Sequence, residues 1–154
     1  MLPTKRDQQG VPTTEVWGDF PVTYHYTVGI SGEKFFEGLK NQKLVANTCN
    51  SCNKTYLPPK LFCEDCFDEL TDDSYKEIKA SGKLVSFTEV FLDHRGDKLS
   101  DPYFLALIQL NGTDTTFFHK LINTNNPTIG GNVTAVWNDT RSGSLFDLNG
   151  FQAE

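Results

Sequence analysis

Cys49-Asn-Ser-Cys52 and Cys63-Glu-Asp-Cys66 are the stretches of sequence that decide the fold of this chain. Two residues between thiols let a tight turn direct both sulfur atoms at one tetrahedral ion, and two such turns complete a four-thiolate site. The chain contains 4 cysteines, so this site uses every thiol and leaves none as a nucleophile. The pattern predicts a metal ribbon with Cys49, Cys52, Cys63 and Cys66 as its ligands.

Zinc is the expected ion because tetrahedral sites of four sulfurs favour it, although iron in a rubredoxin-like site uses the same ligands at nearly the same spacing. Two disulfides or four free thiols are the alternative, which the spacing and a reducing compartment disfavour. A closed four-sulfur site has no open position for water or substrate. We therefore expect the metal to fold the ribbon, where structural zinc contributes roughly 10–16 kcal/mol in finger peptides, and not to catalyse a reaction.

The ribbon itself is expected over residues 46–73. Residues 43–46 enter the first knuckle as a strand, and residues 54–57 leave it as the returning strand. Asn53 follows the second cysteine of the first knuckle, where such turns need a left-handed residue, and Asn is the best substitute for Gly at such a position.

The N-terminal part, residues 1–45, is predicted to form an arm and a short helix. Gly and Pro residues interrupt residues 1–29, and no periodic pattern persists there. Exposed tails seldom keep four aromatic residues, so we expect the arm to pack on the body or on a partner, through Trp17, Phe20, Tyr24 and Tyr26.

The helix is predicted from Ser31, as its N-cap, to about Gln42. Phe35, Phe36 and Leu39 share one face of this helix, which needs another element to cover it.

Residues 74–154 carry strand signals with Gly-rich connections and little helix. Five short strands of this kind fit a small barrel such as an OB-fold, and a five-stranded sandwich fragment is the competing arrangement. The Asn111-Gly112 dipeptide predicts the turn between two of the strands. The expected strands span residues 83–91, 103–110, 113–121, 132–137 and 144–148.

The charge balance opposes a nucleic-acid partner. The chain has a net charge of −6, with 14 basic and 20 acidic residues, whereas a groove that follows a phosphate backbone needs clustered Lys and Arg. Aromatic residues of the predicted strands could stack on bases, but such residues more often belong to a barrel core. These residues are Phe87, Phe91, Phe104, Phe117 and Phe118.

No catalytic motif accompanies the ribbon. His25, His94 and His119 share no pattern, and the chain contains no nucleophile elbow, phosphate-binding loop or metalloprotease helix. Alternation along the strand places His119 opposite Phe118, in a structural or surface role. We therefore expect no catalytic activity from the chain alone. The first nineteen residues have no apolar leader region and no run is long enough to span a membrane, which favours a cytoplasmic protein.

The order of motifs resembles the rubredoxin-like zinc-ribbon and OB-fold family catalogued as domain of unknown function thirty-five. The resemblance covers about residues 30–150, and its most specific part is the knuckle pair with the Pro58-Pro59-Lys60 step between them. It implies a non-catalytic accessory subunit, in a hetero-oligomer, that bridges or supports a thiolase-superfamily enzyme or another enzyme of CoA thioesters. The further motifs are Phe36-Glu-Gly-Leu39, Ser81-Gly82, Pro102-Tyr103 and Ile129-Gly130.

The resemblance also implies that the chain binds acyl-CoA. Basic and apolar residues that flank the ribbon are the candidate contacts: Lys43, Lys54, Lys60, Leu57 and Phe62. The alternative is that these are surface lysines and neighbours of a metal ribbon.

The sequence departs from the family pattern at three positions. Asn53 and Phe67 stand where the family usually has Gly after a knuckle, and Lys60 stands where it has Arg, which weakens a phosphate role. A module that binds single-stranded nucleic acid remains the alternative function, followed by an enzyme in its own right.

Overall fold

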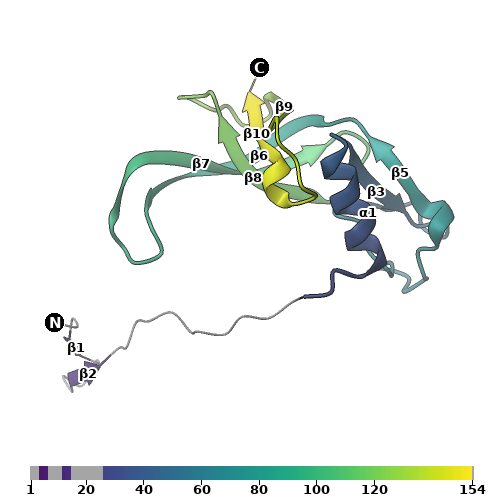
Figure 1. Cartoon of the computed structure of the whole chain (residues 1–154), viewed down its shortest axis with the longest axis horizontal. Helices are drawn as coiled ribbons and strands as arrows, with labels where there is room; N and C mark the ends of the chain where they lie inside the picture. Colours follow the sequence, from purple (N-terminus) through teal and green to yellow (C-terminus); the bar gives the residue numbers. More distant parts are fainter. Residues whose placement is uncertain (1–3, 7–11, 15–25, 154) are drawn as a thin grey trace.

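The computed structural model describes residues 4–6, 12–14 and 26–153. Strands β1 (Thr4–Arg6) and β2 (Pro12–Thr14) pair as a short antiparallel hairpin. From residue 26 onward the chain forms one helix, a three-stranded sheet and a closed five-stranded barrel (Figure 1), so the predicted mainly β fold is confirmed. Within the described residues no helix is long and apolar enough to cross a membrane.

The predictions for most of the N-terminal arm lie outside the described residues, including those for Trp17, Phe20, Tyr24 and His25. Tyr26 is described, and its side chain is exposed.

The N-cap of helix α1 (Gly29–Lys40) lies three residues before the predicted one. Val28 is its N-cap, and no side chain caps the helix. The prediction that Ser31 is the cap is therefore wrong. Ser31 lies within the first turn, and its hydroxyl forms a 2.6 Å hydrogen bond with the hydroxyl of Tyr75, which fixes the helix to a strand of the sheet.

The apolar face of α1 is buried as its pattern predicts. Phe35 and Leu39 are buried, and Phe36 packs at the edge of the same core. Gly38 lies against β3 (Leu44–Thr48), where an added Cβ would come within 2.7 Å of the Val45 side chain. A glycine that weakens an isolated helix thus permits the close approach of this helix to the sheet.

The ribbon sheet has the strand order β4-β3-β5, with β4 at Thr55–Tyr56 and β5 at Tyr75–Ile78. A 3-10 turn, η1 (Asp72–Ser74), leads into β5. Asn47 on the central strand is fully buried, and its side chain donates to the carbonyl of Lys60 (2.6 Å) and accepts the Lys60 N–H (3.1 Å). This clamp holds the segment that joins the two knuckles against the sheet.

The barrel contains β6 (Ser81–Leu92), β7 (Lys98–Leu110), β8 (Thr116–Ile122), β9 (Asn132–Trp137) and β10 (Leu148–Ala153). Its closed order is β10-β8-β7-β6-β9, in which β8 and β10 run parallel and the other neighbours run antiparallel. A closed five-stranded mixed barrel confirms the OB-fold prediction over the sandwich.

The predicted strand at residues 144–148 is wrong. Its first part is a 3-10 turn, η2 (Leu145–Asp147), and the fifth strand begins only at Leu148. The cause is the Asp147 carboxylate, which accepts the backbone N–H groups of Ser142, Gly143 and Ser144 at 2.7–3.2 Å. These hydrogen bonds curl the chain into a turn where the sequence pattern indicates an extended strand.

A long hairpin of β6 and β7 projects from the barrel (Figure 1). Pairing of β7 with β8 reaches only to Phe104, whereas β6 and β7 continue to pair with each other as far as Leu92 and Lys98. Asp93 shapes the tip by accepting the N–H groups of Arg95 and Asp97.

Helix, ribbon and barrel share one apolar core. Phe35 of α1, Leu57 beside β4, and Phe117 and Phe151 of the barrel belong to the same buried cluster. The Phe117 ring lies 6.3 Å from the Phe35 ring and 6.2 Å from the Phe151 ring, both in edge-to-face geometry. The core therefore fixes the position of the ribbon relative to the barrel.

Candidate metal centre

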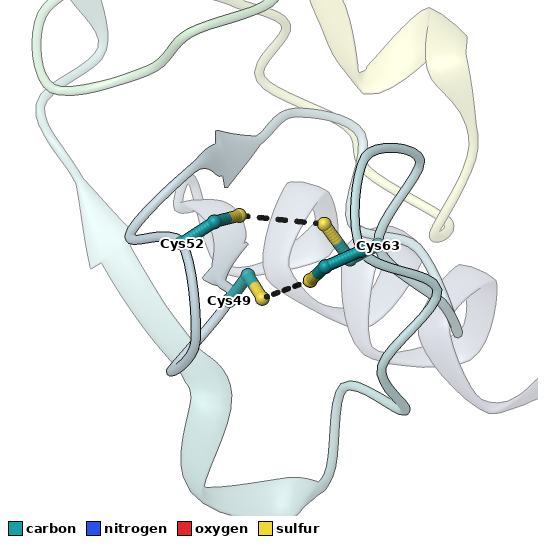
Figure 2. Close-up of side chains that lie close together, drawn as sticks. Cys49, Cys52 and Cys63 are labelled. Carbon is teal, nitrogen blue, oxygen red and sulfur yellow. Dashed lines mark hydrogen bonds between the residues drawn. The ribbon is translucent and has the colours of Figure 1, made fainter.

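The four cysteines meet at one point, with all four Sγ atoms within 4.8 Å of one another. The short contacts run between the knuckles: Cys49 to Cys66 at 3.4 Å and Cys52 to Cys63 at 3.5 Å (Figure 2). Disulfide sulfurs lie about 2.05 Å apart, so these are thiols. Four sulfurs at about 2.3 Å from a tetrahedral ion would be about 3.8 Å apart. The donor set therefore fits one tetrahedral zinc or iron ion.

The two knuckles repeat one backbone geometry. In the first, Cys49 N–H donates to the Lys54 carbonyl and Asn53 N–H to the Cys49 carbonyl, both at 2.8 Å. The second knuckle has the same pair of bonds, from Cys63 to Asp68 and from Phe67 to Cys63.

The residue after each second cysteine is left-handed. Asn53 and Phe67 both have a φ of 61°, as predicted for Asn53. Glycine adopts this left-handed backbone conformation without strain, whereas the Cβ atom of Phe67 makes it unfavourable.

Tyr56 lies beside the metal ligands, a contact that the sequence analysis does not predict. Its buried hydroxyl lies 3.1 Å from Cys63 Sγ and accepts the N–H of Glu64 at 3.1 Å. The hydrogen bond from Tyr56, followed by the N–H of Cys66, lowers the pKa of Cys63 to about 6. Burial and the bond to Cys63 raise the pKa of Tyr56 to about 12, so the phenol stays a donor. In the sequence, Tyr56 is marked by its place in the strand that leaves the first knuckle and at the start of the Tyr56-Leu-Pro-Pro-Lys60 segment.

A set of hydrogen bonds ties the ribbon to the turn between β7 and β8. Thr115 Oγ1 accepts the Leu57 N–H (2.8 Å) and donates to the Leu57 carbonyl (2.9 Å). Asp114 likewise accepts the Thr55 N–H with its carboxylate (2.8 Å) and donates its own N–H to the Thr55 carbonyl (2.9 Å). The strand that returns from the first knuckle is thus anchored at both residues, and the metal site is coupled to the barrel.

The three lysines among the candidate acyl-CoA contacts are all paired with acidic side chains. Lys43 pairs with Glu77 (2.8 Å), Lys54 with Asp65 (2.8 Å) and Lys60 with Glu64. The ammonium groups of Lys54 and Lys60 lie 6.0 Å and 5.1 Å from the centroid of one ring, that of Tyr56. The two apolar candidates differ in exposure, since Leu57 is 1% exposed and Phe62 is 57% exposed.

The two described histidines lie apart. His94 is exposed in the hairpin tip. His119 points to the inner side of β8 and stacks on Phe117 at 5.9 Å. Burial lowers the pKa of His119, so the imidazole is neutral at pH 7.

The aromatic residues that were considered as a stacking surface for bases differ in their burial. Phe117 is buried, Phe87 and Phe104 pack edge to face, and Phe91 and Phe118 are exposed on different elements. They do not form one platform.

A zinc ribbon joined through a shared core to an OB barrel is the class of protein that this fold and site define. Residues 36–71 match the family model of the ChsH2 rubredoxin-like zinc ribbon domain. This match confirms the resemblance stated from the sequence for the ribbon part of the chain.

Two solved structures share the fold of this chain over the ribbon and the barrel together. A protein of unknown function of the DUF35 family from Sulfolobus solfataricus is 25% identical, with a TM-score of 0.62 over 81% of this chain and 84% of that chain. A chain of the Ltp2-ChsH2(DUF35) aldolase is 20% identical, with a TM-score of 0.61 over 84% of this chain and 98% of that chain. The resemblance thus extends from the ribbon to the barrel.

Proposed function

We propose that this chain is a non-catalytic accessory subunit that binds one zinc ion through Cys49, Cys52, Cys63 and Cys66 and docks on an enzyme of CoA thioesters, of the thiolase superfamily. In this proposal the metal holds the ribbon in shape and takes no part in chemistry, because four protein thiolates leave no position for a substrate.

The observation that carries the proposal is the projecting β6–β7 hairpin. Phe91 and Leu92 near its end are 55% and 50% exposed, although a two-stranded ribbon in water is marginally stable by itself. Exposed large apolar side chains on such an extension are typical of a protein interface. The likeness to a chain of an aldolase complex supports an enzyme as the partner.

The proposal includes binding of acyl-CoA beside the ribbon. The ammonium groups of Lys54 and Lys60 both lie near the ring of Tyr56 and would hold phosphate groups. These ammonium groups already form ion pairs with Asp65 and Glu64, so a phosphate has to displace a carboxylate. We therefore expect this contact to be weak and sensitive to salt unless the partner enzyme adds further donors.

Nucleic-acid binding receives less support from the same contacts. Four lysines around the ribbon and helix, Lys34, Lys43, Lys54 and Lys60, each have an acidic partner within 4.0 Å. Lysines that are already paired with carboxylates contribute less to neutralising a phosphate backbone.

The test is affinity capture of the tagged chain from an extract of its own cells, followed by mass spectrometry and metal analysis. We expect one zinc per chain and a stoichiometric enzyme of CoA thioesters. The double variant Phe91→Ser/Leu92→Ser should lose this enzyme, whereas Val85→Ser, which changes an exposed apolar residue on the barrel part of β6, should retain it. Recovery of the chain with nucleic acid, or turnover of a thioester by the chain alone, would contradict the proposal.

A further inference from the structure

The Asn111-Gly112 step between β7 and β8 carries a chemical reactivity besides its role as a turn. When glycine follows asparagine, the glycine nitrogen can attack the asparagine Cγ atom. The bond from Cγ to Nδ2 then breaks, and ammonia leaves. Water opens the resulting succinimide ring at either carbonyl, which yields aspartate or isoaspartate. Glycine favours this attack because it has no Cβ to hinder it. The chain contains two such steps, Asn111-Gly112 and Asn149-Gly150.

The Asn111-Gly112 peptide lies in an exposed turn, which the hydrogen bond from the Thr113 N–H to the Leu110 carbonyl closes at 3.2 Å. Gly112 has a φ of 83°, and a Cβ added there would meet no heavy atom within 4 Å beyond its chain neighbours. Among the described residues the Gly112 N–H has no hydrogen-bond acceptor. The attacking nitrogen is therefore accessible to solvent and is not engaged in another bond.

Ser81 is the neighbour that holds Asn111. The Asn111 N–H donates to the Ser81 carbonyl at 3.0 Å, and its Nδ2 donates to Ser81 Oγ at 3.2 Å. The first bond can persist during the reaction, because ring closure rotates the peptide on the other side of Asn111. The second bond joins exposed groups, so water replaces it at a small cost. Neither bond prevents the side chain from reaching the Gly112 nitrogen.

The Asn149-Gly150 step has the same residues in a setting that opposes the reaction. Both residues belong to β10, and Gly150 pairs with Val136 of β9. Gly150 is buried, and an added Cβ would lie 2.8 Å from the Ile122 side chain and 2.9 Å from the Lys120 carbonyl. Ring closure requires the peptide to leave its extended conformation. Strand β10 would therefore have to open locally before Asn149 could react.

We propose that Asn111 is a site of spontaneous deamidation, at which the folded chain acquires aspartate or isoaspartate, and that β10 protects Asn149. The net reaction consumes one water and releases one ammonia, without an enzyme or a cofactor. Both products place a new carboxylate in the turn. The inference goes beyond the proposed function, because it requires neither the partner enzyme nor acyl-CoA.

The position of the turn gives the modification a structural consequence. Isoaspartate adds one carbon to the main chain just before Thr113, whose hydroxyl bonds to the carbonyls of Leu110 and Thr115 at 3.0 Å. Asp114 and Thr115 follow directly, and they anchor the strand that returns from the first knuckle. We therefore expect the modified chain to hold the ribbon less firmly and to unfold at a lower urea concentration.

The test incubates the full chain, loaded with zinc, at neutral pH and follows its tryptic peptides by mass spectrometry. The two sites fall in different peptides, and electron-transfer fragmentation distinguishes isoaspartate from aspartate. A sample taken at the start corrects for reaction during digestion. Asn111 should react at least about tenfold faster than Asn149 in the folded chain, whereas the two sites should react at similar rates in urea. The rate at Asn111 should rise with pH, since the nitrogen must lose its proton to attack.

Variants connect the reaction to stability. Asn111→Gln keeps the amide but would have to close a larger ring, so it should show no reaction at this turn. Its urea midpoint should stay constant during incubation, whereas that of the unaltered chain should fall as the product accumulates. Asn149→Gln, which changes an exposed side chain of β10, should leave the rate at Asn111 unchanged.

Two results would overturn the inference. One is reaction at Asn149 as fast as at Asn111 in the folded chain, which would mean that β10 gives no protection. The other is reaction at Asn111 at least about tenfold slower in the folded chain than in urea, which would mean that the turn holds the peptide out of reach. Capture of the partner enzyme is a separate measurement, so the proposed function stands or fails independently.

Discussion

Thr115→Val is the substitution that most directly tests the coupling of the ribbon to the barrel. The valine keeps the shape of the side chain and removes the hydroxyl that makes two hydrogen bonds with the backbone of Leu57. Leu57 is 1% exposed, so its N–H and carbonyl groups would lose their partners in a nearly dry place. Each bond contributes about 0.5–1.5 kcal/mol, and an unpaired buried group costs about 1–3 kcal/mol.

Because Thr115 itself is half-buried and water can partly replace the hydroxyl, we expect a loss of about 2–4 kcal/mol in the free energy of unfolding. For a chain of this length, that corresponds to a fall in Tm of roughly 4–16 °C. Urea denaturation followed by circular dichroism, at a fixed zinc concentration, measures the change. Thr115→Ser is the matched control, since it retains the hydroxyl. If the Val and Ser variants differed by less than about 0.5 kcal/mol, the coupling through Leu57 would be refuted.

Three further predictions concern the metal site and the barrel interior. Cys63→Ser should reduce the zinc content from about one ion per chain to nearly none, measured by plasma mass spectrometry, and full zinc retention would exclude the four-thiolate site. Phe67→Gly should raise the stability against urea by up to about 1 kcal/mol, because it relieves a left-handed residue whose side chain is 79% exposed. Asn53→Gly should give a smaller gain, and the reverse order would contradict the strain at Phe67. Burial lowers the pKa of His119 below its usual 6.5, so its contribution to stability is present above pH 6.5 and is lost as the pH falls below it. The difference in Tm between the unaltered chain and His119→Phe should therefore change between pH 7.5 and 5.5, and a constant difference would argue against this role.

The sequence was most informative where structure is local. The knuckles depend on two-residue spacings and on a left-handed residue after each pair, and both properties are readable from residues 49–53. Strand β9 was predicted with its observed bounds, because an alternating segment lies between two clear turn signals. The five-stranded barrel was predicted from the number of short strands and from the family resemblance, whereas the order of its strands was not predicted.

The sequence failed where a distant contact decides the local conformation. Ser31 is a residue type that often caps helices, but its hydroxyl instead forms a hydrogen bond with the hydroxyl of Tyr75 on β5. Asp147 ends a strand-like run because three N–H groups of a preceding loop converge on it. Tyr56 resembles any strand aromatic until folding places its hydroxyl beside Cys63.

The order of elements along the chain has a consequence for how the protein matures on the ribosome. All three strands of the ribbon sheet and all four cysteines precede Ser81, whereas the barrel closes only when β10 pairs with both β8 and β9. At about 5–20 residues per second, the ribbon emerges roughly 4–15 s before the strand that closes the barrel. While the chain is still being synthesised, the four thiols of the ribbon can therefore either bind zinc or be oxidised. Metal capture by the nascent ribbon would come first, and the barrel would then assemble against a part that has already acquired its shape.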